Sequence, residues 1–221
     1  MTNVSATAEK LATRKGLFAF AIKSLEREGW VVSRIPKAGK ASLRQISRNG
    51  ERKTVSIRTS QDTWIAFPRA AGDDNWVTLD VVDYVVAASV NDKHDPTEAR
   101  VHMIPGEVAR DHWDRAYEAR TAAGFSIPVG RGIWLALYAE ETAEPVSLVG
   151  AGLGLKYPPI GKCDLSSEPL LVDDADTVAP DQEDSAIVSP RVEFLTISEA
   201  KKRLSVSLGV PESAIKITVE H

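Results

Sequence analysis

Basic side chains gather in a short part of the chain, between residues 37 and 58. Ammonium and guanidinium groups bind phosphate oxygens, and Arg does so through two parallel hydrogen bonds. A cluster of this kind indicates either a surface that follows a nucleic-acid backbone or an ordinary solvated strand face, and the spacing fits both. The candidate nucleic-acid-binding residues are Lys37, Lys40, Arg44, Arg48, Arg52, Lys53 and Arg58.

Two aromatic residues, Trp64 and Phe67, follow this basic segment. Nucleobases stack on accessible aromatic rings, so both side chains are candidates for base contacts. Aromatic residues on strands are more often part of a hydrophobic core, which is the competing interpretation.

Charge is divided unevenly along the chain, whose net charge is −4. Residues 1–69 contain 14 Lys and Arg against 5 Asp and Glu, a balance of +9, so residues 70–221 carry −13. A basic region on an otherwise acidic protein suits a polyanion such as nucleic acid, or an acidic protein partner.

The elements that would carry these residues can be predicted from periodicity. From Ala8 to Glu28 apolar residues recur at helical spacing, and Gly29 follows as a stop signal. The basic segment after it predicts a β-hairpin, because the dipeptide Asn49-Gly50 separates two β-rich runs.

Later segments predict a sheet and a second helix. Residues 79–90 form a nearly continuous apolar run, as expected for a strand buried on both faces, and residues 100–105 form another strand. Residues 106–124 have helical periodicity. Residues 131–141 and 145–154 fit either two strands or a short helix and a strand. We therefore expect an α/β (α+β) fold with a mixed central sheet flanked by helices.

The C-terminal part predicts an appendage to a main domain of residues 1–164. Residues 165–190 are acidic, contain proline and lack periodicity, which is typical of a flexible linker. Residues 191–221 form a predicted β-α-β unit, with Thr196 and Glu199 in capping-box spacing. Such a unit buries too little surface to fold alone, so we expect it to dock on the main domain or to join a homo- or hetero-oligomer.

Composition excludes several classes of protein. The 43% hydrophobic content supports a folded core, and Cys163 is the only cysteine, which excludes an internal disulfide and favours a reducing compartment. The N-terminal residues lack an apolar signal region, and no run approaches the roughly 20 apolar residues of a membrane span. We expect a cytoplasmic protein without membrane contact.

The order of segments carries a family likeness over residues 8–124. It consists of a helix ending in EREGW, then VVSRIP, a polar hairpin with TVSIRTS, the strand WIAF, and VDYVVAAS and VHMIP followed by a helix. This order resembles the restriction-endonuclease-like (PD-(D/E)XK) superfamily. The resemblance implies an aspartate at the start of the hairpin and Glu-x-Lys on its second strand, which together hold magnesium and activate water.

The chain departs from that pattern at the catalytic positions. Ser42 stands at the aspartate position, and Ser56-Ile57-Arg58 stands at the Glu-x-Lys position. Period-two alternation puts Ser56 and Arg58 on one face, with Val55 and Ile57 toward the core. A cleft of hydroxyls and a guanidinium lacks a carboxylate for magnesium but suits a phosphate. We therefore expect no catalytic residues and no cofactor.

Three other carboxylates define the alternative of an active enzyme. If the cutting site has moved within the fold, Asp80, Asp83 and Glu107 are the first candidates for catalysis with magnesium. The structural interpretation is stronger, because Asp83 suits a strand end and Glu107 suits the positive end of a helix dipole.

Other motifs predict no chemistry. The histidines form no recognised close pair, so we expect His102 to be a satisfied strand residue and His112 to lie on a half-solvated helix. The glycines of GAGLGLKYPPIGK lack a phosphate-loop ending and are expected to permit turns or close packing.

Three functional hypotheses follow. The first is a non-catalytic nucleic-acid-binding protein with a degenerate nuclease-like fold, for which the resemblance implies bacterial defence or genome maintenance. The second is a protein-interaction module, such as an immunity or antitoxin-like factor, whose basic face meets an acidic partner. The third is a metal-dependent nuclease with displaced carboxylates.

Overall fold

The computed structural model describes residues 8–35, 42–70, 75–92, 94–127, 130, 132–165 and 170. The chain divides into two compact units, residues 1–186 and 187–221. The helices of the first unit are α1 (Ala8–Arg27), α2 (Gly106–Ala122) and α3 (Leu153–Lys156), with a 3-10 helix, η1, at Val146–Leu148. The strands are β1 (Val31–Arg34), β2 (Leu43–Arg48), β3 (Glu51–Ser60), β4 (Trp64–Pro68), β5 (Tyr84–Val90), β6 (Glu98–Pro105), β7 (Gly132–Ala136) and β8 (Pro159–Asp164).

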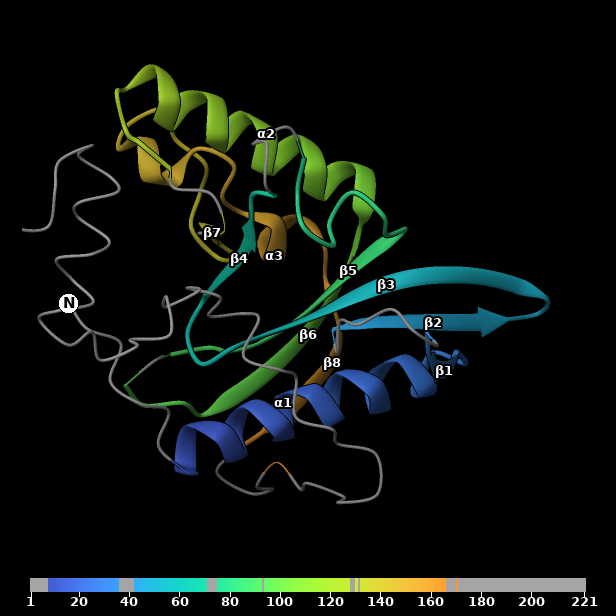
Figure 1. Cartoon of the computed structure of the whole chain (residues 1–221). Coiled ribbons are helices and arrows are strands. Elements are labelled where there is room, and N and C mark those ends of the chain that lie inside the picture. Colours follow the sequence, from blue (N-terminus) through green and yellow to red (C-terminus); the bar gives the residue numbers. More distant parts are fainter. Residues whose placement is uncertain are drawn as a thin grey trace, which may run out of the picture. The chain divides into compact units, whose positions relative to one another are not determined.

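Six strands form one mixed sheet, in the order β1-β2-β3-β5-β6-β8 (Figure 1). The β3–β5 pair is parallel and the other four pairs are antiparallel. Strands β4 and β7 pair separately as a two-stranded antiparallel ribbon. This architecture confirms the predicted α+β class with a mixed sheet flanked by helices.

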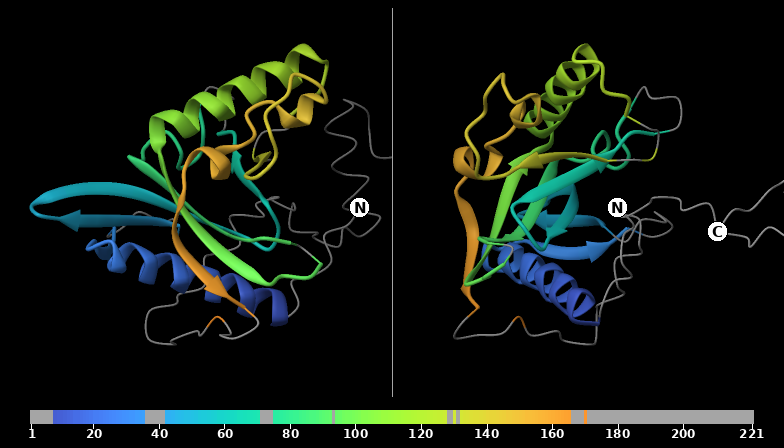
Figure 2. Two further views of the ribbon diagram at one scale, coloured as in Figure 1. Left: turned by 180° about the vertical axis from the view of Figure 1, so that it is seen from behind. Right: turned by 90° about the vertical axis from the view of Figure 1, so that its left-hand side faces the viewer.

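Each face of the sheet carries its own hydrophobic core. On one face, α1 packs Leu17 and Phe18 against strand residues that include Val86. On the other, α2 packs Trp113 against Val85 and the inner side of the β4–β7 ribbon. Figure 2 shows the two helices on opposite sides of the sheet. Because both faces are covered, β5 is nearly continuous in apolar residues, with Ser89 as the exception.

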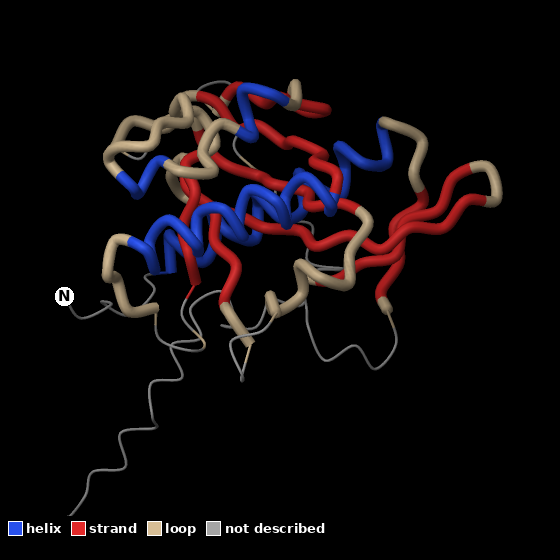
Figure 3. The backbone as a smooth tube through the Cα atoms, turned by 90° about the horizontal axis from the view of Figure 1, so that it is seen from above, coloured by secondary structure: helices blue, strands red, loops and turns tan. Residues whose placement is uncertain are grey.

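The β2–β3 hairpin turns at the predicted dipeptide. Asn49 has φ 52° and Gly50 has φ 82°, the two positive values that a type I′ turn requires. Cross-strand pairing runs from Leu43 opposite Ser56 to Arg48 opposite Glu51. The turn projects beyond the neighbouring helices (Figure 3). We call β1, β2 and residues 51–56 of β3 the hairpin arm.

Several segments differ from the sequence expectation. Residues 79–83 form turns rather than the start of β5, because Thr78 has a positive φ of 67° that redirects the chain. Of the two alternatives for residues 131–154, the strand (β7) and short helix are the ones present. Strand β8 was not predicted, because its first residue follows Pro158 and the segment has no clear alternation.

Most of the predicted appendage falls outside the described residues. The linker of residues 165–190 is described only at Leu165 and Leu170, and the β-α-β unit of residues 191–221 is not described. None of the helices in the described part of the chain combines the length and apolarity that a bilayer crossing requires.

Candidate nucleic-acid interface

The hairpin arm has one face turned toward α1 and one turned away from it. Val32 and Ile46 pack with the α1 core, so their strand neighbours point to the opposite side. All of these neighbours are exposed or half-buried. We call them the open face of the arm, and they are Val31, Ser33, Gln45, Ser47, Arg52 and Thr54.

The open face combines hydroxyl and amide groups with a cation and carries no negative side chain. Ser47 lies opposite Val31 on one side and Arg52 on the other, and Gln45 lies opposite Thr54. Ser, Thr, Gln and Arg side chains are common donors to phosphate oxygens. The open face can therefore donate several hydrogen bonds to an anion without charge repulsion.

Arg52 is the most available cation of the arm. It is exposed, and it has no hydrogen bond or ion pair among the described residues. Its neighbour Lys53 points to the other face, where its Nζ lies 3.2 Å from Glu51 and 3.9 Å from Asp83. The hydrogen bond with Glu51, with help from Asp83, raises the pKa of Lys53. Lys53 is thus partly neutralised, whereas Arg52 is not.

Arg44 and Arg48 lie on the α1 face of the arm and contact aromatic rings. The Arg48 guanidinium lies 4.3 Å from the centre of the Trp30 ring and donates to Glu28 O at 2.8 Å, near the negative end of α1. Arg44 is buried, with its guanidinium 5.0 Å from the Phe18 ring centre. Arg48 remains exposed at the edge of the arm, while Arg44 is a packing residue.

Arg58 is buried rather than displayed in a cleft. It retains 5% of its exposure, its guanidinium lies 4.2 Å from the Phe67 ring centre, and its Nη2 donates to Thr78 Oγ1. Ser56 shares its face, as predicted, but is fully buried, and its Oγ has no hydrogen-bond partner in the described part of the chain. The expected cleft is absent at this point because α2 and the β4–β7 ribbon cover that face of the sheet.

The remaining predicted binding residues, Lys37 and Lys40, lie outside the described residues. Of the seven candidates, the structure therefore places Arg48, Arg52 and Lys53 at accessible positions on the arm. A phosphate contact by Arg44 or Arg58 would require either side chain to leave its aromatic partner.

The three candidate catalytic carboxylates all lie near the start of β5, but two already accept hydrogen bonds from the backbone. Asp83 Oδ2 accepts from Thr54 N at 2.7 Å, and Asp80 Oδ2 accepts from Trp76 N at 2.6 Å. Glu107 is exposed in the first turn of α2, where the helix dipole favours a negative charge.

These residues do not fit the magnesium ion that the resemblance implies. Ser42, Ser56 and Arg58 supply no carboxylate, and a hard divalent cation requires several oxygen ligands. Within the described ranges, no group of three His, Cys, Asp or Glu side chains is placed to hold a metal ion.

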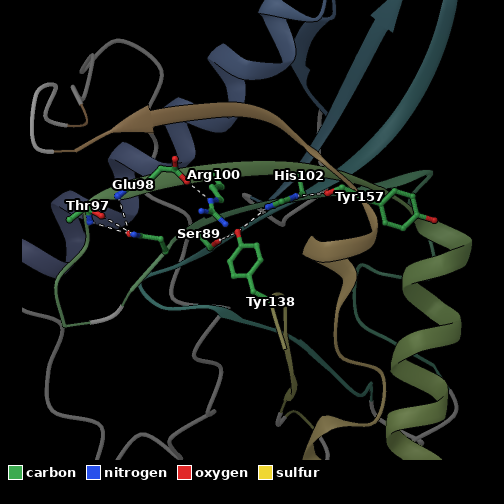
Figure 4. A network of polar contacts seen from close by, with 8 residues as sticks. Ser89, Thr97, Glu98, Arg100, His102, Tyr138 and Tyr157 are labelled. Atoms are coloured by element: carbon green, nitrogen blue, oxygen red, sulfur yellow. Dashed lines mark hydrogen bonds and ion pairs between the residues drawn. The ribbon is translucent and has the colours of Figure 1, made fainter. Parts of the chain in front are cut away.

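A buried polar network joins β5 and β6 to Tyr138, after β7, and to Tyr157, before β8 (Figure 4). Tyr157 O can only accept, so His102 Nδ1 donates to it at 2.7 Å and His102 Nε2 accepts from Tyr138 Oη at 2.9 Å. Tyr138 Oη in turn accepts from Ser89 Oγ at 2.8 Å. Burial lowers the pKa of His102 and raises that of Tyr138, so both are neutral near pH 7. The prediction that His102 is a satisfied strand residue is confirmed.

An open pocket of about 510 Å³ lies between α2, α3 and the segment after β7. Burial alone would raise the pKa of Glu141, but hydrogen bonds from Arg115 and Gly150 N lower it. Arg115 also pairs with Asp111, so the charges in this lining largely compensate one another. His112 at its edge is buried and donates to Gly150 O at 2.9 Å, which corrects the expectation of a half-solvated position.

The two aromatic candidates, Phe67 and Trp64, differ in burial. Phe67 is fully buried and meets Trp113 edge to face at 5.0 Å, so the core interpretation holds for it. Trp64 is only half-buried and points to the outer side of the β4–β7 ribbon. Sequence reasoning missed Trp134, which is 50% exposed on the same side, because nothing local shows that β7 pairs with β4.

Compared with family models, with curated proteins and with solved structures, the chain has no significant match.

Proposed function

We propose that this protein binds the phosphate backbone of nucleic acids through the hairpin arm and does not cleave it. The observation that carries the proposal is the composition of the open face: hydroxyl and amide groups lie around the exposed Arg52, which has no ion pair among the described residues, and none of the six residues of the face is a carboxylate. Arg48 adds a second exposed cation at the turn of the arm.

Backbone binding suits this geometry better than recognition of a small molecule. The arm projects from the sheet rather than forming a hollow, and its polar groups are spread along three neighbouring strands. Repeating phosphates offer equally spaced acceptors to such a surface, and each neutralised phosphate releases counterions. The role in bacterial defence or genome maintenance that the family resemblance implies is part of this proposal.

Absence of cleavage follows from the residues at the expected cutting positions. Positions 42, 56 and 58 supply no carboxylate ligand for a metal that would activate water. Asp80 and Asp83 are engaged by backbone N–H groups, which accounts for both carboxylates without a catalytic role.

Charge reversal tests the proposal. Arg52→Glu should abolish binding of fluorescein-labelled DNA at low salt, because it replaces the available cation with a group that repels phosphate. Lys162→Glu is the matched control, since Lys162 is also exposed but lies on β8, at the opposite edge of the sheet. Equal effects of the two changes would show that only net charge matters and would contradict a site on the arm.

An acidic protein is the second candidate partner. Val31 favours it, because this apolar side chain is 66% exposed on the same open face and has no use in phosphate binding. A protein complex would bury Val31 and form with fixed stoichiometry, so Val31→Ser would weaken it. The same change should leave nucleic-acid binding unaltered.

A further inference from the structure

The outer side of the β4–β7 ribbon is an apolar surface with two tryptophans. Ile65, Phe67, Ile133 and Leu135 face the core, so the alternate residues face outward. The outward residues are Trp64, Ala66, Pro68, Gly132, Trp134 and Ala136. Ala136 is buried at 4% exposure, whereas Trp134 is exposed and the other four are half-buried. We call this surface the tryptophan ribbon.

The two indoles are diagonal neighbours with small residues beside them. Trp64 lies opposite Ala136, and Trp134 lies opposite Ala66. Diagonal positions on an antiparallel pair are about 7–8 Å apart, which is within reach of two large rings and of a flat group stacked on either one. Trp134 is 50% exposed and Trp64 is half-buried.

These two tryptophans differ from the other three in the chain. Trp76 and Trp113 are buried and donate their indole N–H groups to Asp114 and Ile133 O, and Trp30 is covered by Arg48. Trp64 and Trp134 have no such acceptor in the described residues and no ring partner there. Paired, accessible indoles on a strand ribbon indicate a contact surface rather than a core.

We infer that the tryptophan ribbon is a stacking surface for the bases of single-stranded nucleic acid. This inference rests on the proposed backbone binding and adds the type of nucleic acid. Bases of a single strand are free to stack on aromatic side chains, whereas those of a duplex are not. A sugar ligand would also need several polar side chains around the rings, and among the outward residues of the described ribbon only the two indole N–H groups are polar.

The charge next to the ribbon suits a nucleic acid. Gln61, three residues before Trp64, donates from its side chain to Lys10 O, which places the first turns of α1 beside this end of the ribbon. Lys10 is exposed there and Lys15 is half-buried. The nearest carboxylate in the strand connection, Asp62, is occupied by Ser60 Oγ and Trp64 N. The described side chains beside this end of the ribbon therefore include two basic residues, Lys10 and Lys15.

Two oligomers of equal length separate base stacking from backbone binding. One is fluorescein-labelled oligothymidylate about 15 nucleotides long, and the other is an abasic oligomer with the same number of phosphates. The full-length protein should bind oligothymidylate at least about tenfold more tightly than the abasic oligomer at the same salt concentration.

Substitution then assigns the preference to the ribbon. Trp134→Ala should remove most of the difference between the two oligomers and leave the abasic affinity unchanged, whereas Trp134→Phe should retain part of it. Phe125→Ala is the matched control, because Phe125 is 58% exposed but lies outside the ribbon, after α2. Circular dichroism of each variant checks that the fold is kept.

The outcomes distinguish the two proposals. Equal affinity for both oligomers, or an unchanged preference in Trp134→Ala, would overturn base stacking while leaving backbone binding intact. Binding of neither oligomer would overturn both.

Discussion

The guanidinium of Arg58 lies on the ring of Phe67, with its central carbon 4.2 Å from the ring centre. The same guanidinium donates to Thr78, a β-branched residue with a positive φ of 67°. A conformation of this kind is uncommon for a β-branched side chain, so the surrounding contacts must hold it. Arg58 thus ties β3 to β4 and to the turn before β5.

Arg58→Ala should lower the free energy of unfolding by roughly 2–3 kcal/mol, because it removes a buried cation–π contact and leaves a cavity. Urea unfolding followed by tryptophan fluorescence measures this change. The folded variant should bind DNA as the wild type does. Wild-type stability combined with lost binding would mean that Arg58 contacts the ligand instead.

Arg52→Ala should have the opposite pattern. Its stability should stay within about 0.5 kcal/mol of the wild type, because Arg52 is exposed and has no ion pair in the part of the chain that the structure describes. Its affinity for single-stranded DNA should fall, and the slope of log affinity against log salt should become shallower by about 0.7, the single-strand value for one lost phosphate contact. The control Lys162→Ala should leave the slope unchanged.

Asp83→Ala should destabilise the fold by about 1–2 kcal/mol, because Thr54 N loses its acceptor. Glu107→Ala should lower the free energy of unfolding by only a few tenths of a kcal/mol, because it removes a favourable charge at the start of α2 and not the acceptor of a backbone N–H group. With magnesium, DNA should stay intact in the presence of wild type and both variants. Magnesium-dependent cleavage that each substitution abolishes would support displaced catalysis.

Lowering the pH should reduce the stability of the fold, because His102 becomes protonated. Burial lowers the pKa of this imidazole below its usual value near 6.5, so the unfolded chain binds a proton more readily than the folded one. The stabilising effect of the neutral ring is complete above pH 6.5 and is lost as the pH falls through the lowered pKa. The charges of Arg100 and Lys162 oppose protonation in the same direction.

Unfolding in urea at a series of pH values between about 8 and 5 checks this prediction. His102→Gln should reduce the fall in stability on acidification, whereas the control His94→Gln, at an exposed site, should not. An unchanged pH dependence in His102→Gln would assign the effect to other groups.

Local sequence signals predicted the elements well and their partners poorly. Asn49-Gly50 favours a tight turn because both residues tolerate a positive φ, whatever packs around the hairpin. Gly29 ends α1 for the same reason, since it too has a positive φ. The burial of Arg58 depends on Phe67, and that of Arg44 depends on Phe18, in a different element. A long basic side chain is compatible with solvent or with an aromatic ring, so charge alone does not distinguish them.

The same limit explains what sequence reasoning missed in the candidate sites. Trp134 shares a surface with Trp64 only because β4 and β7 pair across about seventy residues of chain. The open face of the arm likewise depends on which helix covers which side of the sheet. Alternation along β2 and β3 separates two faces, but it does not indicate that α1 takes one of them and leaves the other exposed.

The most direct measurement is the anisotropy of labelled single-stranded DNA, titrated with the wild-type protein from low to near-physiological salt. The two exposed cations on which the proposal rests, Arg48 and Arg52, predict binding at low salt with a log–log slope of about −1.4. The single-strand value is about −0.7 for each phosphate neutralised. Absence of binding at low salt, or affinity independent of salt, would contradict the proposal that the arm holds a nucleic-acid backbone.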